Sequence, residues 1–141
     1  MTPRQIDLVQ DSFAQVKPIA EAAADLFYAR LFLLDPGLRG MFKNDMKKQG
    51  QMLMSMIGAA VSGLRNLEVL SPVVRQLGAR HTGYGVKPEH YETVGAALLW
   101  TLDKGLKEQF TPEVREAWAS AYQLLSDVMQ LGAMDHQRAA A

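Results

Sequence analysis

Three polar side chains fall at positions where the spacing of this sequence favours apolar ones. His81 follows Leu77 by four residues and Val74 by seven, so the three share one face of a helix. Tyr28 lies on the flank of one apolar helical stripe, and Gln49 precedes another by one turn. An imidazole binds metal ions, while a phenol and an amide each donate and accept hydrogen bonds. These residue types make metal binding and hydrogen bonding to a small ligand the chemistry to consider.

Each of these side chains also has a structural interpretation. An inward-facing histidine is more often a hydrogen-bonded core residue than a ligand, and a buried tyrosine usually bonds a backbone carbonyl. An amide at the start of an apolar stripe often lies at the surface edge. Tyr91, three residues before Val94, is a second ambiguous phenol. The nearby methionines are more typical of adaptable core filling than of a metal site, although one could be an axial ligand. They are Met41, Met46, Met52, Met54 and Met56.

The choice of metal ligands is narrow. The chain has no cysteine, which excludes disulfides, thiolate nucleophiles, iron–sulfur clusters and cysteine-based zinc sites. The three imidazoles are His81, His90 and His136; His90 is expected in solvent beside Glu89, and His136 in the tail. One inward histidine cannot build a zinc site, and no paired carboxylates, glycine-rich phosphate loop or Ser/His/Asp arrangement stands out. His81 is therefore the candidate metal ligand.

Prolines and apolar spacing predict that helices position these residues. Proline fits the first turn of a helix, where its missing N–H would be unpaired. Four prolines follow a capping residue, in Thr2-Pro3, Asp35-Pro36, Ser71-Pro72 and Thr111-Pro112. The apolar spacing predicts helices over residues 6–16, 20–34, 45–64, 73–81, 91–101 and 114–128, with a short turn over 36–41. Strict alternation is missing, so the sequence predicts an all-α protein.

Length and charge limit the organisation of the chain. Its 141 residues predict one domain over 1–141, with its core over 3–131 and a flexible tail over 135–141. Lys+Arg and Asp+Glu both number 15, which argues against a nucleic-acid partner. No apolar run approaches the ~18 residues that span a bilayer, so no membrane partner is expected. The expected location is the cytoplasm.

Several separated motifs resemble the globin domain of bacterial flavohaemoglobins and the single-domain bacterial haemoglobins. The resemblance covers residues 3–131, and the stretch from His81 to Gly95 is its most specific part. The matching motifs are Phe27-Tyr28, Asp35-Pro36, Phe42, Gln49, Leu53, Leu77, His81, Lys87-Pro88-Glu89-His90-Tyr91, Val94-Gly95 and Ala117-Trp118-Ala119-Ser120-Ala121-Tyr122.

The resemblance implies a globin fold of six main helices and a short turn, packed around one non-covalently held haem b (iron protoporphyrin IX). By this resemblance His81 is the proximal iron ligand, and Tyr28, Gln49 and Leu53 are the distal residues. Phe42 matches a phenylalanine that packs on the haem. Arg80 has two equal interpretations, as a partner of a haem propionate or as a solvated arginine. The expected haem-binding residues are Phe42, Leu53, Leu77, Arg80, His81, Val86, Tyr91 and Val94.

One part of the family pattern is missing. In flavohaemoglobins, a tyrosine matched here by Tyr91 and a glutamate in the last helix polarise the proximal histidine. The corresponding segment, Leu131-Gly132-Ala133, contains no glutamate. The family's flavin and NADH reductase domain is also not among these 141 residues.

The resemblance implies reversible binding of O2, CO and NO at a pentacoordinate haem iron, for oxygen carriage, storage or scavenging. One alternative is a nitric oxide dioxygenase or peroxidase-like enzyme that uses a separate reductase. Another is a haem-based gas sensor, and a fourth is a haem-free helical adaptor. The sequence does not choose between a monomer and a homodimer.

Overall fold

The chain folds into six α-helices and three short 3-10 helices, in a computed structural model that describes residues 1–42, 45–83 and 85–140, with side chains up to Asp135. No strand occurs within these ranges, so the all-α prediction is confirmed. The 3-10 segment at Pro36–Met41 confirms the predicted short turn. The elements are α1 (Pro3–Val16), η1 (Lys17–Ile19), α2 (Ala20–Leu34), η2 (Pro36–Met41), α3 (Met46–Ser62), α4 (Leu67–Gly83), α5 (Pro88–Leu106), η3 (Lys107–Gln109) and α6 (Pro112–Ala140).

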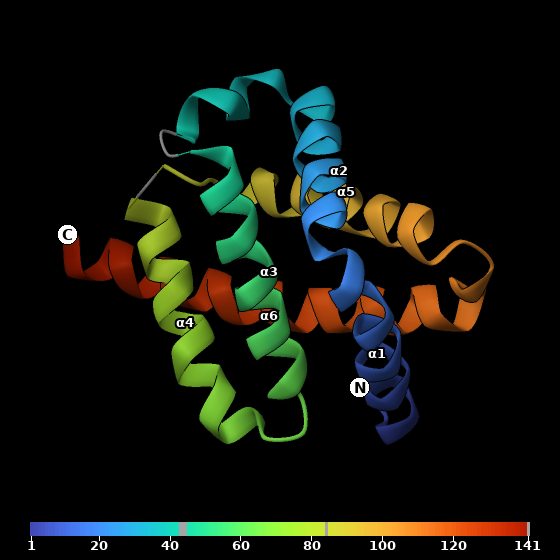
Figure 1. Cartoon of the computed structure of the whole chain (residues 1–141). Coiled ribbons are helices and arrows are strands. Elements are labelled where there is room, and N and C mark those ends of the chain that lie inside the picture. The colour runs from blue at the N-terminus through green and yellow to red at the C-terminus, as the bar shows by residue number, and fades with distance from the viewer. Residues whose placement is uncertain (43–44, 84, 141) are drawn as a thin grey trace.

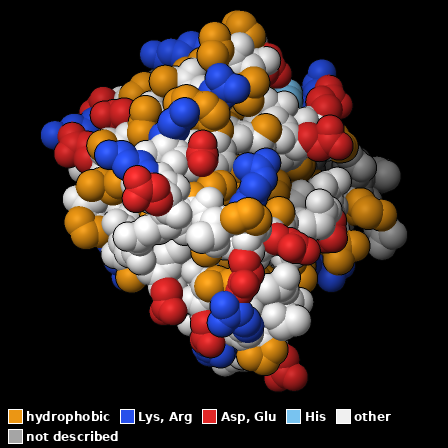
Figure 2. Space-filling model, turned by 90° about the vertical axis from the view of Figure 1, so that its right-hand side faces the viewer, with side chains coloured by type: hydrophobic (Ala, Val, Ile, Leu, Met, Phe, Trp, Pro, Cys, Tyr) orange, Lys and Arg blue, Asp and Glu red, His pale blue; other side chains and the backbone are white. Residues whose placement is uncertain are grey.

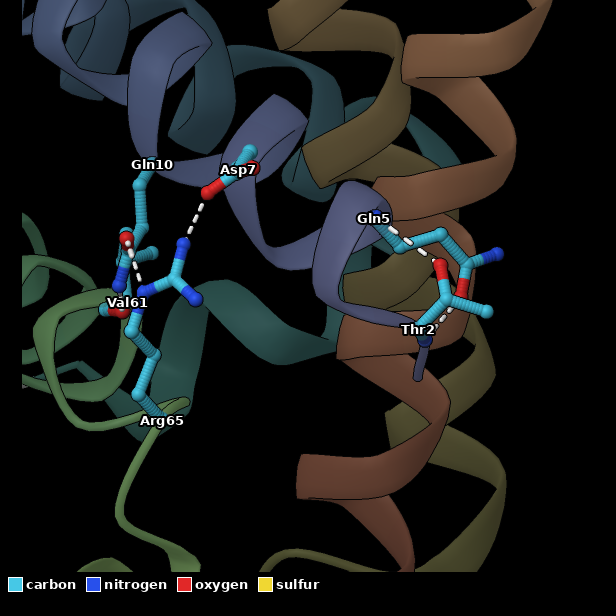
Figure 3. Close-up of polar contacts among 6 residues, drawn as sticks. All are labelled: Thr2, Gln5, Asp7, Gln10, Val61 and Arg65. Atoms are coloured by element: carbon cyan, nitrogen blue, oxygen red, sulfur yellow. Dashed lines mark hydrogen bonds and ion pairs between the residues drawn. The ribbon is translucent and has the colours of Figure 1, made fainter.

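Three of the four predicted proline caps are confirmed. The Thr2 hydroxyl accepts from the backbone N–H of Gln5 at 3.1 Å, and the Gln5 side chain accepts from the Thr2 N–H at 3.0 Å (Figure 3). This capping box satisfies two helix-end donors. The side chains of Asp35 and Thr111 likewise accept backbone N–H groups at the starts of η2 and α6.

The fourth proline prediction is wrong. Pro72 lies inside α4 instead of at its first turn, and the helix begins at Leu67. Its first backbone bonds run to the carbonyl of Asn66, from Val69 at 3.2 Å and from Leu70 at 3.1 Å. Pro72 therefore leaves the carbonyl of Glu68, in the first turn, without its helical donor, and packing of the helix outweighs this loss.

Two apolar clusters form the core. The larger joins α1, α3, α5 and α6, and the Trp118 indole N–H donates to the buried Ser12 hydroxyl at 2.8 Å across it. The smaller gathers around α2, beside η2 and the middle of α5. Figure 1 shows α5 passing behind α2, and α6 passing behind α4; both pairs are in contact. The buried residues of the smaller cluster are Phe27, Tyr28, Leu31, Leu38 and Ala97.

A glycine brings α2 and α3 close together. A Cβ at Gly50 would lie only 2.9 Å from the Cβ of Ala24, so a larger residue would push the helices apart. Tyr28 follows Ala24 by one turn, and Gln49 directly precedes Gly50. This close approach therefore places the predicted distal tyrosine and glutamine beside each other.

Polar contacts tie α1 to the loop between α3 and α4. Arg65 in this loop forms an ion pair with Asp7 and donates to the Gln10 side chain at 3.3 Å. The Gln10 amide in turn donates to the carbonyl of Val61 at 3.0 Å (Figure 3). These contacts fix the end of α3 and the loop that leads to α4 against α1.

The visible surface is mixed in charge. On the face shown in Figure 2, basic and acidic side chains are interspersed, as the balanced totals of 15 and 15 suggest. Among the helices of the described ranges, none is long and apolar enough to span a bilayer.

Candidate functional site

Tyr28 lies in an aromatic cluster on α2. Its side chain is buried, and its ring centroid lies 5.1 Å from that of Phe27, 5.9 Å from that of Phe32 and 5.4 Å from that of Phe42. Leu53 from α3 and Val94 from α5 pack on the same cluster. The structure therefore brings together four residues that the sequence predicted around the ligand, which are Tyr28, Phe42, Leu53 and Val94.

The Tyr28 hydroxyl is a neutral hydrogen-bond donor beside Gln49. It lies 3.5 Å from the Gln49 backbone carbonyl, a long and weak contact. Burial raises the pKa of Tyr28 above its ordinary value, and contact with the Gln49 side chain offsets part of this rise. The phenol thus keeps its proton at neutral pH. Because its present bond is weak, it can donate to a better acceptor placed beside it.

His81 is oriented by its own helix. Its Nδ1 lies 2.8 Å from the carbonyl oxygen of Leu77, one turn earlier in α4. A carbonyl only accepts, so Nδ1 carries the proton and the lone pair of the neutral ring is on Nε2. The backbone then turns back, and the N–H of Val86 donates to the His81 carbonyl at 3.0 Å. Leu77, His81 and Val86 form a second group of predicted site residues.

The topology places both groups at one end of the α3–α4 pair. Gln49 precedes the connecting loop over residues 63–66 by 14 residues, and His81 follows it by 15. At ~1.5 Å per helical residue, both positions lie roughly 20 Å from the loop. Figure 1 shows the start of α3 and the end of α4 at the same, upper end of the molecule.

Exposed apolar side chains follow the same two helices. Met52 and Met56 are 54% and 39% exposed, and they share a helical face with Gln49. On α4, the 58% exposed Val73 precedes Leu77 and His81 in steps of four residues. The prediction of core filling is therefore wrong for these two methionines, although Met41, Met46 and Met54 do pack on the core. The spacing from Gln49 is the sequence signal that could have found them.

Tyr91, on α5, presents an unpaired polar atom. Its side chain is buried, and its hydroxyl has no hydrogen-bond partner within the described part of the chain. Its backbone carbonyl accepts from the Tyr122 hydroxyl at 2.5 Å. Gly95 makes room for that ring, since a Cβ there would lie 2.7 Å from it. Burial raises the pKa of both phenols, so both are neutral donors.

The remaining sequence-predicted residues lie outside these groups. Arg80 is exposed, which leaves both of its interpretations open. The His90 ring accepts from the Lys87 N–H at 2.9 Å and caps α5, so its place is structural. The side chain of His136 falls outside the described residues.

Two cavities lie elsewhere. An apolar void of about 20 Å3 lies between the core clusters and reaches Phe27 and Leu53. A surface groove of about 430 Å3 lies where α1 meets the α3–α4 loop. Neither is lined by Tyr28 or His81.

The described side chains fit a metal centre in which a cofactor, and not the protein, supplies most of the metal ligands. Within the described ranges, no group of three His, Cys, Asp or Glu side chains could hold a bare ion. Haem iron needs only one axial protein ligand, and the Nε2 of His81 is of the right kind. A flat apolar ring would also cover the exposed side chains of Met52, Met56 and Val73. The fold and these residues therefore fit a helical haem protein.

Comparison with known proteins identifies the family. The family model described as Globin matches residues 25–129. The flavohemoprotein of Vibrio cholerae serotype O1 is 31% identical over 131 residues, which cover 91% of this chain and 33% of that protein. The flavohemoprotein of Halalkalibacterium halodurans is 38% identical over 111 residues, which cover 77% of this chain and 27% of that protein. This chain belongs to the globin family and is a haem-binding globin.

The chain matches only part of each flavohemoprotein, but it matches nearly the whole of one solved structure. The chain spans a third or less of the length of these two flavohemoproteins. An engineered carbene transferase from Rhodothermus marinus, described as a candidate nitric oxide dioxygenase, superposes with a TM-score of 0.84. The likeness covers 99% of this chain and 96% of that one at 22% sequence identity, and it confirms the globin fold.

Proposed function

We propose that this globin binds O2 reversibly, together with CO and NO, at a haem b held by His81. The proposed role is oxygen carriage, storage or scavenging. The observation that carries the proposal is the buried Tyr28 hydroxyl, which keeps its proton and holds only a 3.5 Å contact to Gln49. Such a donor stabilises a small ligand that gains negative charge.

The two sides of the site have different roles in this proposal. When bound, haem supplies an iron with one open coordination position for a diatomic gas. His81 binds through Nε2, while its Nδ1–H bond to Leu77 fixes the ring. On the other side Tyr28 donates to the gas ligand, and the Gln49 amide supports it.

Apolar residues complete the pocket. Leu53 would form the distal wall and limit ligand size, and Phe42, whose ring packs on that of Tyr28, would contact the haem. The exposed Met52 and Met56 would cover the haem from α3 and exclude water from it. Excluding water slows unwanted side reactions of the ligand. Tyr91 supports the proximal side, where its buried hydroxyl supplies a donor.

A nitric oxide dioxygenase is the second candidate. It is favoured by the relatives named flavohemoprotein, and by the solved structure described as a candidate nitric oxide dioxygenase. Repeated turnover would require electrons, so this function needs a reductase that supplies them.

Sustained NO consumption separates the two functions. We expect the reduced, oxygenated protein to consume about one NO per haem and then stop, with or without NADH and an added flavoprotein reductase. We also expect repeated cycles of argon and air to restore the same absorption spectrum. Many turnovers per haem in the presence of the reductase would instead establish the enzyme.

A further inference from the structure

The helix that carries His81 meets α6 at two glycines. A Cβ at Gly78 would lie 1.9 Å from the carbonyl oxygen of Met129, and a Cβ at Gly132 would lie 1.7 Å from that of Arg75. The atoms met are backbone atoms, so no side chain can move aside to make room. The helices reach this separation because both residues lack a Cβ. We call this contact the glycine crossing.

The placement of α4 depends on this contact. Among the elements of the described chain, α6 is the one against which α4 packs extensively, and Figure 1 shows the two helices crossing. The Arg75 side chain closes the crossing by binding both carboxylate oxygens of Asp135, with Nε at 2.5 Å and Nη2 at 3.0 Å. The opposite face of α4 carries the exposed Val69 and Val73. A shift at the crossing would therefore move α4 as a unit.

The crossing lies in the turn that orients the imidazole. Leu77, whose carbonyl accepts from His81 Nδ1, directly precedes Gly78. The Gly78 carbonyl accepts from the Thr82 hydroxyl at 3.2 Å, and Thr82 directly follows His81. Because residues 77–82 are two consecutive turns of α4 joined by these bonds, a displacement of Gly78 also displaces the His81 ring.

We propose that Gly78 and Gly132 are positioning residues, which set the distance and tilt of the His81 imidazole relative to the haem iron. This inference rests on the proposed role of His81 as axial ligand. Any side chain at position 132 forces α4 away from α6, and the strain falls on the bond between the imidazole and the iron. The same backbone approach leaves no space for any side chain at position 132.

The test is Gly132→Ala in the haem-loaded protein. We expect the iron–histidine stretching band of the reduced protein, measured by resonance Raman spectroscopy, to shift or broaden. We also expect haem transfer to an apoprotein acceptor to speed up by about tenfold, since overpacking by one methyl group is costly. The matched control is Gly105→Ala, also within a helix, where the new Cβ would lie 3.4 Å from an Ile19 methyl group. The control should keep the wild-type band and rate.

A milder variant covers the case in which Gly132→Ala does not fold. Asp135→Asn weakens the ion pair at the crossing without a clash, and it should also shift or broaden the band. Asp7→Asn, which weakens the surface pair with Arg65, should not. A wild-type band and rate in both Gly132→Ala and Asp135→Asn would overturn the inference. Loss of the histidine band from the wild-type protein would instead overturn the proposed role of His81.

Discussion

Replacing His81 with alanine is expected to abolish the histidine-ligated haem spectrum. The Nδ1–H bond to Leu77 directs the lone pair to Nε2, and no described cluster of side chains offers a replacement site. Loss of an outer-shell partner costs about 10–100-fold in metal affinity, so loss of the ligand itself should cost at least about 100-fold. A haemin titration followed by absorbance measures this change, and free imidazole should restore part of the spectrum.

His90→Ala is the matched control for this experiment. It removes an imidazole of the same kind, but this one accepts the Lys87 N–H at the start of α5. We expect a small loss of stability, typical of a lost helix cap, and an unchanged haem spectrum. If His81→Ala kept the wild-type spectrum and affinity, the ligand would have to be another residue.

Replacing Tyr28 with phenylalanine is expected to speed O2 release by at least about tenfold. A hydrogen bond to a charged group contributes about 1.5–3 kcal/mol, and each ~1.4 kcal/mol is a factor of ten. Phenylalanine keeps the ring contacts with Phe27, Phe32 and Phe42, so the variant removes the donor and retains the packing. Stopped-flow displacement of O2 by CO measures the release rate.

Tyr122→Phe provides the comparison for that measurement. It also deletes a buried phenol hydroxyl, but one that donates to the Tyr91 carbonyl on α5. Its O2 release rate should stay within about twofold of wild type, because this hydroxyl already has a backbone partner. Equal release rates in wild type and Tyr28→Phe would remove Tyr28 from the proposed role.

The helices could be predicted because their signals are local. Apolar residues at helical spacing found all six, and the Thr2 and Thr111 caps marked the starts of α1 and α6. The same reasoning failed at Pro72, since it treated a proline as a start. Helix α4 continues through Pro72 because it packs against α6. Such long-range packing cannot be read from the residues next to the proline.

The candidate site could be predicted from the sequence only as a set of residue types. The structure brings Tyr28, Phe42, Leu53 and Val94 into one cluster, and their roles toward a haem stay predictions. The exposure of Met52 was missed because a methionine at helical spacing fits a core as well as a pocket wall. Helical periodicity tells which residues share a face, and only the packed helices show what that face meets.

The glycine crossing shows a second limit of sequence reasoning. From the sequence, Gly132 is only one residue of a segment, Leu131-Gly132-Ala133, that contains no glutamate. The structure adds that the backbone of Arg75 occupies the space of a side chain at position 132. Such a contact joins residues 57 positions apart in the chain, and no local pattern reports it.

The central claim is that this chain holds one haem through an imidazole and leaves one coordination position open to a gas. Its most direct test is a haemin titration of the purified protein, with absorption spectra of the ferric, dithionite-reduced and CO-treated forms. We predict saturation at one haem per chain, a five-coordinate histidine-ligated spectrum on reduction, and complete conversion by CO. A protein that stays colourless with added haemin, or whose reduced haem already carries two protein ligands and resists CO, would contradict the claim.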